Sequence, residues 1–129
     1  MSICQELQQK ADEYLIINPA ALQILMQISH SGLQLQQAVI RASNNCGCVK
    51  LSTKKTLLPK EASWQDLKNQ PTGDELQGLC PECRSLIKDK MGSMLFYIAA
   101  LANAFDIDMD EIIQKEINQL DILGYFMLM

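Results

Sequence analysis

The sequence of 129 residues has few aromatic side chains, no long apolar run and no recognisable leader. Aromatic residues make up 5% of the chain, so aliphatic side chains must supply most of the packing, which favours helices over strands. The longest nearly uncharged apolar run, 91–105, is too short to span a membrane. No basic segment followed by an apolar stretch comes after Met1, so we expect a cytoplasmic protein without a secretory signal.

Several functional motifs are also absent. The chain carries no Gly-rich phosphate loop, no G-x-S-x-G motif and no basic patch interleaved with aromatic residues. Its formal net charge of −4 argues against non-specific binding to nucleic acid or to an anionic membrane.

What the sequence does contain is helical periodicity. The spacing of its apolar residues predicts four helices, at about residues 2–16, 19–43, 81–104 and 109–123. Ser2 with Gln5, and Asp108 with Glu111, have the spacing of capping boxes. Asn18 and Pro19 suit the N-cap and first position of the second helix. We therefore predict an all-α bundle of four main helices in one domain, residues 1–129.

Finer features of the helices can also be predicted. The third helix is apolar around most of its circumference after residue 91, so we expect it to be central and the most buried. The frequent glutamines of the first two helices are interpreted as an uncharged solvated face. Gly124 is expected to stop the fourth helix. The apolar tail 125–129 is expected to pack on the body or on a second subunit.

An irregular segment separates the second and third helices. Residues 44–79 contain Pro, Gly, Ser and Thr and show no sustained period, and 44–84 is interpreted as a cysteine-containing insertion. Leu51 and the pair at 57–58 are candidates for short extended pieces, and 64–68 for a helical turn. So long a connection in a small domain is functional, disordered or pinned in place.

Two cysteine pairs flank this segment. Cys46 and Cys48 lie at its start, and Cys80 and Cys83 at its end. Two short knuckles from distant places can supply four thiolates to one zinc ion in a closed, structural site. Two other interpretations remain open, namely four unrelated thiols, or a redox pair at 80 and 83. Cys4 has no partner at chelating distance and is expected in the core.

The C-terminal third resembles a known family. The stretch GSMLFYIAALANA at 92–104, the segment DIDMDE at 106–111 and the ending LGYF at 123–126 are similar to the third helix, fourth helix and tail of the MazG-like nucleoside triphosphate pyrophosphohydrolases. The resemblance covers about residues 85–126. It implies an all-α bundle, a homodimer or higher homo-oligomer, and magnesium-dependent hydrolysis between the α and β phosphates.

The family's paired acids are missing here. The resemblance implies an E-x-x-E pair on the second helix and an E-x-x-D pair on the third, which together hold Mg²⁺. No Asp or Glu occurs between Glu13 and Glu61, and the third-helix positions fall on Lys90 and Ser93. A lysine at a metal-ligand position repels Mg²⁺ by about a kcal/mol or more near a surface. We therefore expect the fold without magnesium and without the activity.

A remnant pocket is the expected consequence. It would be lined by His30, Gln34, Asp89, Lys90 and Ser93, and would hold a nucleotide phosphate or another anion without cleaving it. One alternative is an active Mg-dependent pyrophosphohydrolase that uses Glu82, Asp89 or the acids at 106–111. Another is a zinc-dependent module that binds nucleic acid or protein through the basic segment 50–60.

Overall fold

The computed structural model describes residues 1–15, 20–51 and 78–123. Its elements are the helices α1 (Ile3–Tyr14), α2 (Ala21–Arg41), α4 (Pro81–Ala104) and α5 (Met109–Leu123), with a π-helical turn, η1 (Ala42–Cys46), that continues α2. No β-strand occurs within the described ranges apart from a single bridge residue at Lys50. The predicted all-α class is confirmed.

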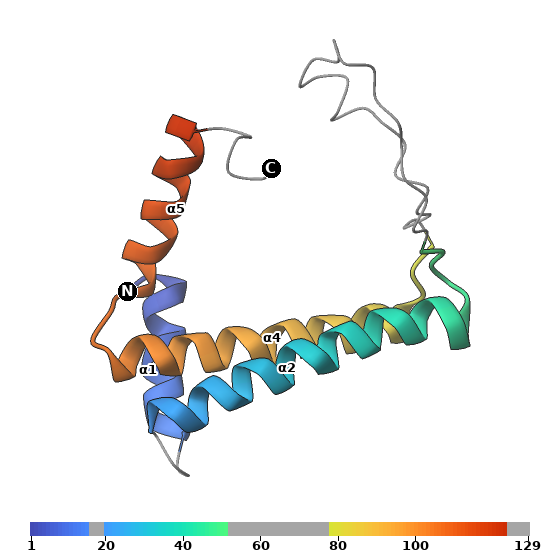
Figure 1. Cartoon of the computed structure of the whole chain (residues 1–129), viewed down its shortest axis with the longest axis horizontal. Helices are drawn as coiled ribbons and strands as arrows, with labels where there is room; N and C mark the ends of the chain where they lie inside the picture. The colour runs from blue at the N-terminus through green and yellow to red at the C-terminus, as the bar shows by residue number, and fades with distance from the viewer. Residues whose placement is uncertain (16–19, 52–77, 124–129) are drawn as a thin grey trace.

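Two long antiparallel helices form the body of the molecule. α2 and α4 lie side by side along their length, and α1 crosses them near one end (Figure 1). α5 contacts α1 and projects away from the pair. The opposite end of the α2–α4 pair carries the two segments that lead to the irregular region.

The N-terminal cap is formed as predicted. The Ser2 hydroxyl accepts from the Gln5 N–H, and the Gln5 side chain accepts from the Ser2 N–H, both at 3.1 Å. The Ser2 hydroxyl also donates to the Asp110 carboxylate at 2.5 Å. This short contact ties the start of α1 to the start of α5.

The predicted cap of α5 is formed differently. Asp108 accepts with its carboxylate from the Asp110 N–H at 3.0 Å, whereas the Glu111 N–H bonds to the Asp108 carbonyl. The Asp108 carboxylate therefore accepts from the Asp110 N–H, and not from the Glu111 N–H that a capping box would use.

The second helix has other bounds than predicted, and its predicted cap lies outside the described residues. α2 begins at Ala21 with Ala20 as its N-cap, two residues after the predicted start. At the other end the chain does not stop near residue 43, because η1 prolongs it through Cys46 to Gly47. Gly47 has φ +78°, in the left-handed region where glycine ends helices without steric strain.

The third predicted helix has the predicted bounds, and α4 is central, since it contacts both α1 and α2. As predicted, it is also the most buried of the four helices, since a smaller share of its residues is exposed than in α1, α2 or α5. It buries Ala99, Ala100 and Ala102, whereas Met91 and Leu95 remain 49% and 50% exposed.

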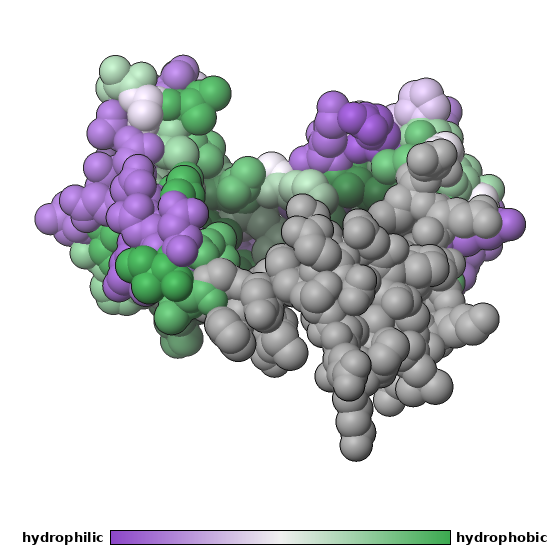
Figure 2. Space-filling model, turned by 90° about the horizontal axis from the view of Figure 1, so that it is seen from above, coloured by the Kyte–Doolittle hydropathy of each residue, from purple (hydrophilic) through white to green (hydrophobic). Residues whose placement is uncertain are grey.

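The core is small and rich in alanine. Its main cluster joins Ala11 of α1, Ile24 of α2, three alanines of α4 and Met109, and Ile24 is the one large side chain among the described residues that is fully buried. Cys4 packs against this cluster, as predicted. Many larger apolar side chains stay at the surface, some of them visible at the end that carries α1 and α5 (Figure 2).

Some predictions fall outside the described residues. They are the cap at 18–19, the extended pieces at 57–58, the turn at 64–68, the helix stop at 124 and the tail at 125–129. Among the helices described, none has the length and apolar character that crossing a membrane requires.

Candidate metal centre

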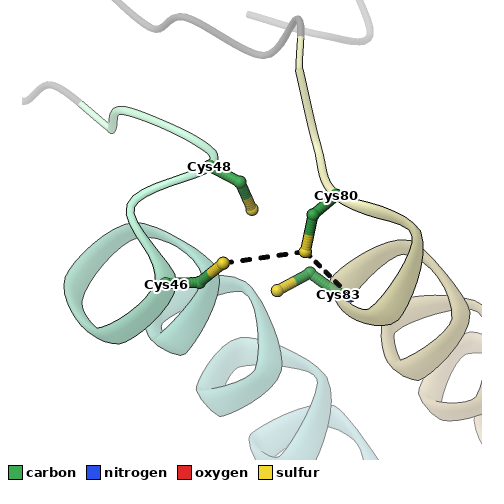
Figure 3. A group of neighbouring side chains, drawn as sticks. All are labelled: Cys46, Cys48, Cys80 and Cys83. Atoms are coloured by element: carbon green, nitrogen blue, oxygen red, sulfur yellow. Dashed lines mark hydrogen bonds between the residues drawn. The ribbon is translucent and has the colours of Figure 1, made fainter.

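The four predicted cysteines meet at the end of the α2–α4 pair. Cys46 ends η1 and Cys48 follows it, while Cys80 and Cys83 come from the start of α4, and the sulfurs point toward one another (Figure 3). All four Sγ atoms lie within 4.8 Å of one another, and those of Cys46 and Cys80 are 3.6 Å apart. Two knuckles separated by 31 residues therefore form one cluster.

The first knuckle depends on the wide turn that ends α2. The Gly47 N–H donates to the Ala42 carbonyl at 2.9 Å, which closes a ring of the i→i−5 type. The Cys48 thiol also lies against the Ala42 carbonyl, at 3.7 Å. Ala42 and Val49 are buried, so apolar contacts hold both sides of this knuckle in place.

The second knuckle is the N-terminus of α4. Cys80 is the N-cap, and its sulfur accepts from the Cys83 N–H at 3.4 Å. Pro81 occupies the first turn, where a missing N–H costs nothing. Gly78 has φ +94° and lies near the Cys48 carbonyl, so the two arms of the irregular segment come together above the cluster.

The helix N-terminus acts on the protonation of the cluster. The Cys83 N–H lowers the pKa of Cys80 to about 7, with further help from hydrogen bonds to the Cys83 and Cys46 thiols. The pKa values of Cys46 and Cys83 are raised, in each case first by the hydrogen bond with Cys80. The thiolate of Cys80 thus forms most readily, while Cys46 and Cys83 retain their protons beside it.

The cluster has the size and chemistry of a metal site. Four sulfurs about 2.3 Å from a tetrahedral ion lie about 3.8 Å from one another, and the observed separations of 3.6 Å and at most 4.8 Å bracket this value. Among the described residues, no other group of three or more Cys, His, Asp or Glu side chains brings its ligand atoms this close together. They can hold one metal ion.

Comparison with protein-family models, curated proteins and solved structures finds no match. The likeness to the MazG-like enzymes therefore remains a prediction that rests on the sequence motifs alone.

The five residues expected in the remnant pocket lie on the α2–α4 pair. His30 and Gln34 are joined by a side-chain hydrogen bond of 3.1 Å along α2. On α4, the Ser93 hydroxyl donates to the Asp89 carbonyl at 3.1 Å, and Lys90 is half-buried. These bonds run within each helix, and a shared pocket remains a prediction.

Three of the four acids at 106–111 line a different pocket. An open hollow of about 510 Å³ is bordered by Asp106, Asp108 and Glu111 together with Asp12 of α1. Sequence reasoning missed Asp12, because nothing in the local pattern of α1 shows that it faces the start of α5. These carboxylates are not gathered closely enough to form a metal-ligand group.

Proposed function

We propose that Cys46, Cys48, Cys80 and Cys83 bind one structural zinc ion in a MazG-like helical scaffold that has lost pyrophosphohydrolase activity. The observation that carries the metal assignment is the convergence of four sulfurs from two distant segments within 4.8 Å. Zinc fits this set because thiolates are soft ligands and four of them complete its tetrahedron. A reducing cytoplasm would keep the thiols available.

Four protein ligands make this a closed site. A catalytic zinc keeps one position for water or substrate, and here every position is filled by the chain. We infer that the ion joins the ends of α2 and α4. Among the described residues, the buried apolar side chains at this end are Ala38, Ala42 and Val49, a small set to hold the two helix ends together.

The loss of activity is inferred from the acids. α2 has no carboxylate between Ala21 and Arg41, and the half-buried Lys90 occupies a position where the resemblance implies a magnesium ligand. With His30 on the neighbouring helix, Lys90 favours a role in holding an anion, such as a nucleotide phosphate, without cleaving it. A protein partner is the other ligand class that the scaffold could serve.

Self-association is part of the proposal. Large apolar side chains on α2, α4 and α5 stay at least one-third exposed in the single chain, while its core consists mainly of alanine. Exposed apolar surface on this scale marks an interface. We infer a homodimer or a higher homo-oligomer.

Metal analysis tests the first part of the proposal. Protein purified without chelator should contain about one zinc ion per chain by inductively coupled plasma mass spectrometry. The variant Cys46→Ser should lose most of it, and Cys4→Ser, outside the cluster, should keep it. A full complement of zinc in Cys46→Ser, or its absence from the wild type, would contradict the assignment.

A nucleotide panel tests the second part. With Mg²⁺ or Mn²⁺ the protein should release no pyrophosphate from the common nucleoside triphosphates. Release would support the alternative of an active enzyme that uses other acids, such as Asp89 or those that border the hollow with Asp12. Binding to DNA or RNA that weakens steeply with salt would support the nucleic-acid alternative.

A further inference from the structure

α2 carries a second apolar face on the side away from α4. Its buried residues Ile24, Ser31 and Ala38 face α4, the described element that packs along it. A shift of two residues turns a helix by about 200°, so the positions two residues before and two residues after each of these lie on the opposite side. They follow the spacing 4, 3, 4, 3, 4 as Leu22, Met26, Ser29, Leu33, Gln36 and Ile40.

The described residues leave this outer stripe uncovered. Its four large apolar members are 68%, 59%, 52% and 49% exposed for Leu22, Met26, Leu33 and Ile40, respectively. An alternating spacing of three and four residues is the pattern that packs one helix along another. The stripe extends over nearly all 21 residues of α2, about 31 Å, so its partner must be a helix of similar length and period.

We propose that the outer stripe packs antiparallel against the same stripe of a second copy of this chain. The proposal specifies the self-association inferred above. A second copy supplies a helix of the required length and period by definition. It also meets no charge repulsion along the contact, because Arg41 is the single formally charged residue of α2 at neutral pH.

Two observations favour the antiparallel direction. Arg41 and the cysteine cluster lie at one end of α2, whereas α1 and α5 gather at the other (Figure 1). A parallel pair would place both arginines, both cysteine centres and both bulky ends side by side. An antiparallel pair separates like charges by about 30 Å and places the α1 and α5 end of one copy away from that of the other.

The spacing fixes the register of this arrangement. Residues whose numbers sum to 62 face each other, so Leu22 meets Ile40, Met26 meets Gln36, and Ser29 meets Leu33 of the other copy. The two polar positions then each face an apolar residue rather than each other. A slip by one step of the stripe would bring Ser29 opposite Gln36 and leave an end residue of each stripe unpaired.

Light scattering on the zinc-loaded full chain tests the interface. The wild type should have twice the mass of the 14.5 kDa chain. Leu33→Asp should weaken the dimer at least 100-fold, because it places a carboxylate at the centre of both halves of the contact. The matched control is Gln27→Asp, which adds the same charge at an exposed position of α2 outside the stripe. Equal zinc content and helical circular dichroism will show that both variants fold.

The outcomes separate this interface from self-association in general. A wild-type monomer at high micromolar concentration would overturn both, and would leave the stripe to a different protein. A Leu33→Asp protein that stays dimeric would overturn the stripe alone. For direction, a photo-crosslinking p-benzoylphenylalanine at Gln36 should capture residues 22–28 of an isotope-labelled second copy. Capture of residues 33–39 would overturn the antiparallel arrangement.

Discussion

The side-chain amides of Gln8 and Asn103 bind each other's helices reciprocally. Gln8 donates from Nε2 to the Asn103 Oδ1 at 3.1 Å, and Asn103 donates from Nδ2 to the Gln8 carbonyl at 2.7 Å. The Gln8 amide also donates to the Ile107 carbonyl and accepts from the Met109 N–H, at 2.8 and 2.9 Å. One side chain of α1 thereby fixes the end of α4 and the start of α5.

We expect Gln8→Ala to lower the free energy of unfolding by about 2 kcal/mol, because it removes three hydrogen bonds that are worth about 1 kcal/mol each and are only partly replaced by water. Gln9→Ala is the matched control, since Gln9 is the exposed neighbour on α1, and it should change stability by less than about 0.5 kcal/mol. Urea unfolding followed by circular dichroism measures both. Equal effects would show that the amide network does not hold the helices.

Two glycines with equally open surroundings should respond in opposite directions to alanine. A Cβ at Gly47 or at Gly92 would have no heavy atom within 4 Å, so sterics with neighbours contribute nothing. Gly47 has φ +78°, where a side chain costs about 1 kcal/mol. Gly92 lies inside α4, where alanine gains about 0.5–1 kcal/mol. Thermal unfolding should therefore show a lower midpoint for Gly47→Ala and a higher one for Gly92→Ala.

The pKa of Cys80 predicts which thiol reacts first in metal-free protein. Because the Cys83 N–H lowers that pKa from 9.0 to about 7, the Cys80 thiolate is half-formed at neutral pH. Alkylation by iodoacetamide should occur first at Cys80, with a midpoint near pH 7, and peptide mass spectrometry identifies the site. Preferential alkylation of Cys83, whose pKa is raised, would contradict this order.

The lowered pKa of Cys80 also makes the stability of the metal-free protein depend on pH. A depressed thiol pKa stabilises the folded metal-free protein fully above about pH 9, and this contribution is lost as the pH falls through 7. Bound zinc should extend protection of the thiols to lower pH, because the metal competes with protons for every sulfur.

Metal removal should loosen one end of the molecule only. After chelation, amide hydrogen exchange should become roughly tenfold faster or more in residues 44–50 and 80–86, which the cluster holds together. Exchange in 99–102 should change little, since these residues pack against α1 in the alanine-rich core. A uniform increase along the chain would show instead that the metal supports the whole fold.

The sequence predicted features that depend on local chemistry. Pro81 after an N-capping position marks the start of α4 correctly, and Ser2 with Gln5 marks the start of α1, because caps act within four residues. The cysteine cluster could also be predicted, since Cys-x-Cys and Cys-x-x-Cys are chelating pairs that converge wherever two helix ends meet.

Features that depend on tertiary contacts were missed. Gln8 was interpreted as part of a solvated face, because its three partner residues at 103–109 cannot be inferred from the spacing of α1. Asp12 escaped attention for the same reason. The extension of α2 was missed because Asn44 and Asn45 favour a helix end in isolation, whereas here a π turn carries the helix on through both.

The π turn at Ala42–Cys46 sets the direction in which the Cys46 side chain leaves the helix. Each residue of a regular helix advances the side-chain direction by about 100°, so loss of a single residue between Ala42 and Cys46 would swing Cys46 away from Cys80. A residue lost beyond Cys48 would leave this helical phase unchanged. The number of residues before Gly47 therefore decides whether Cys46 faces Cys80.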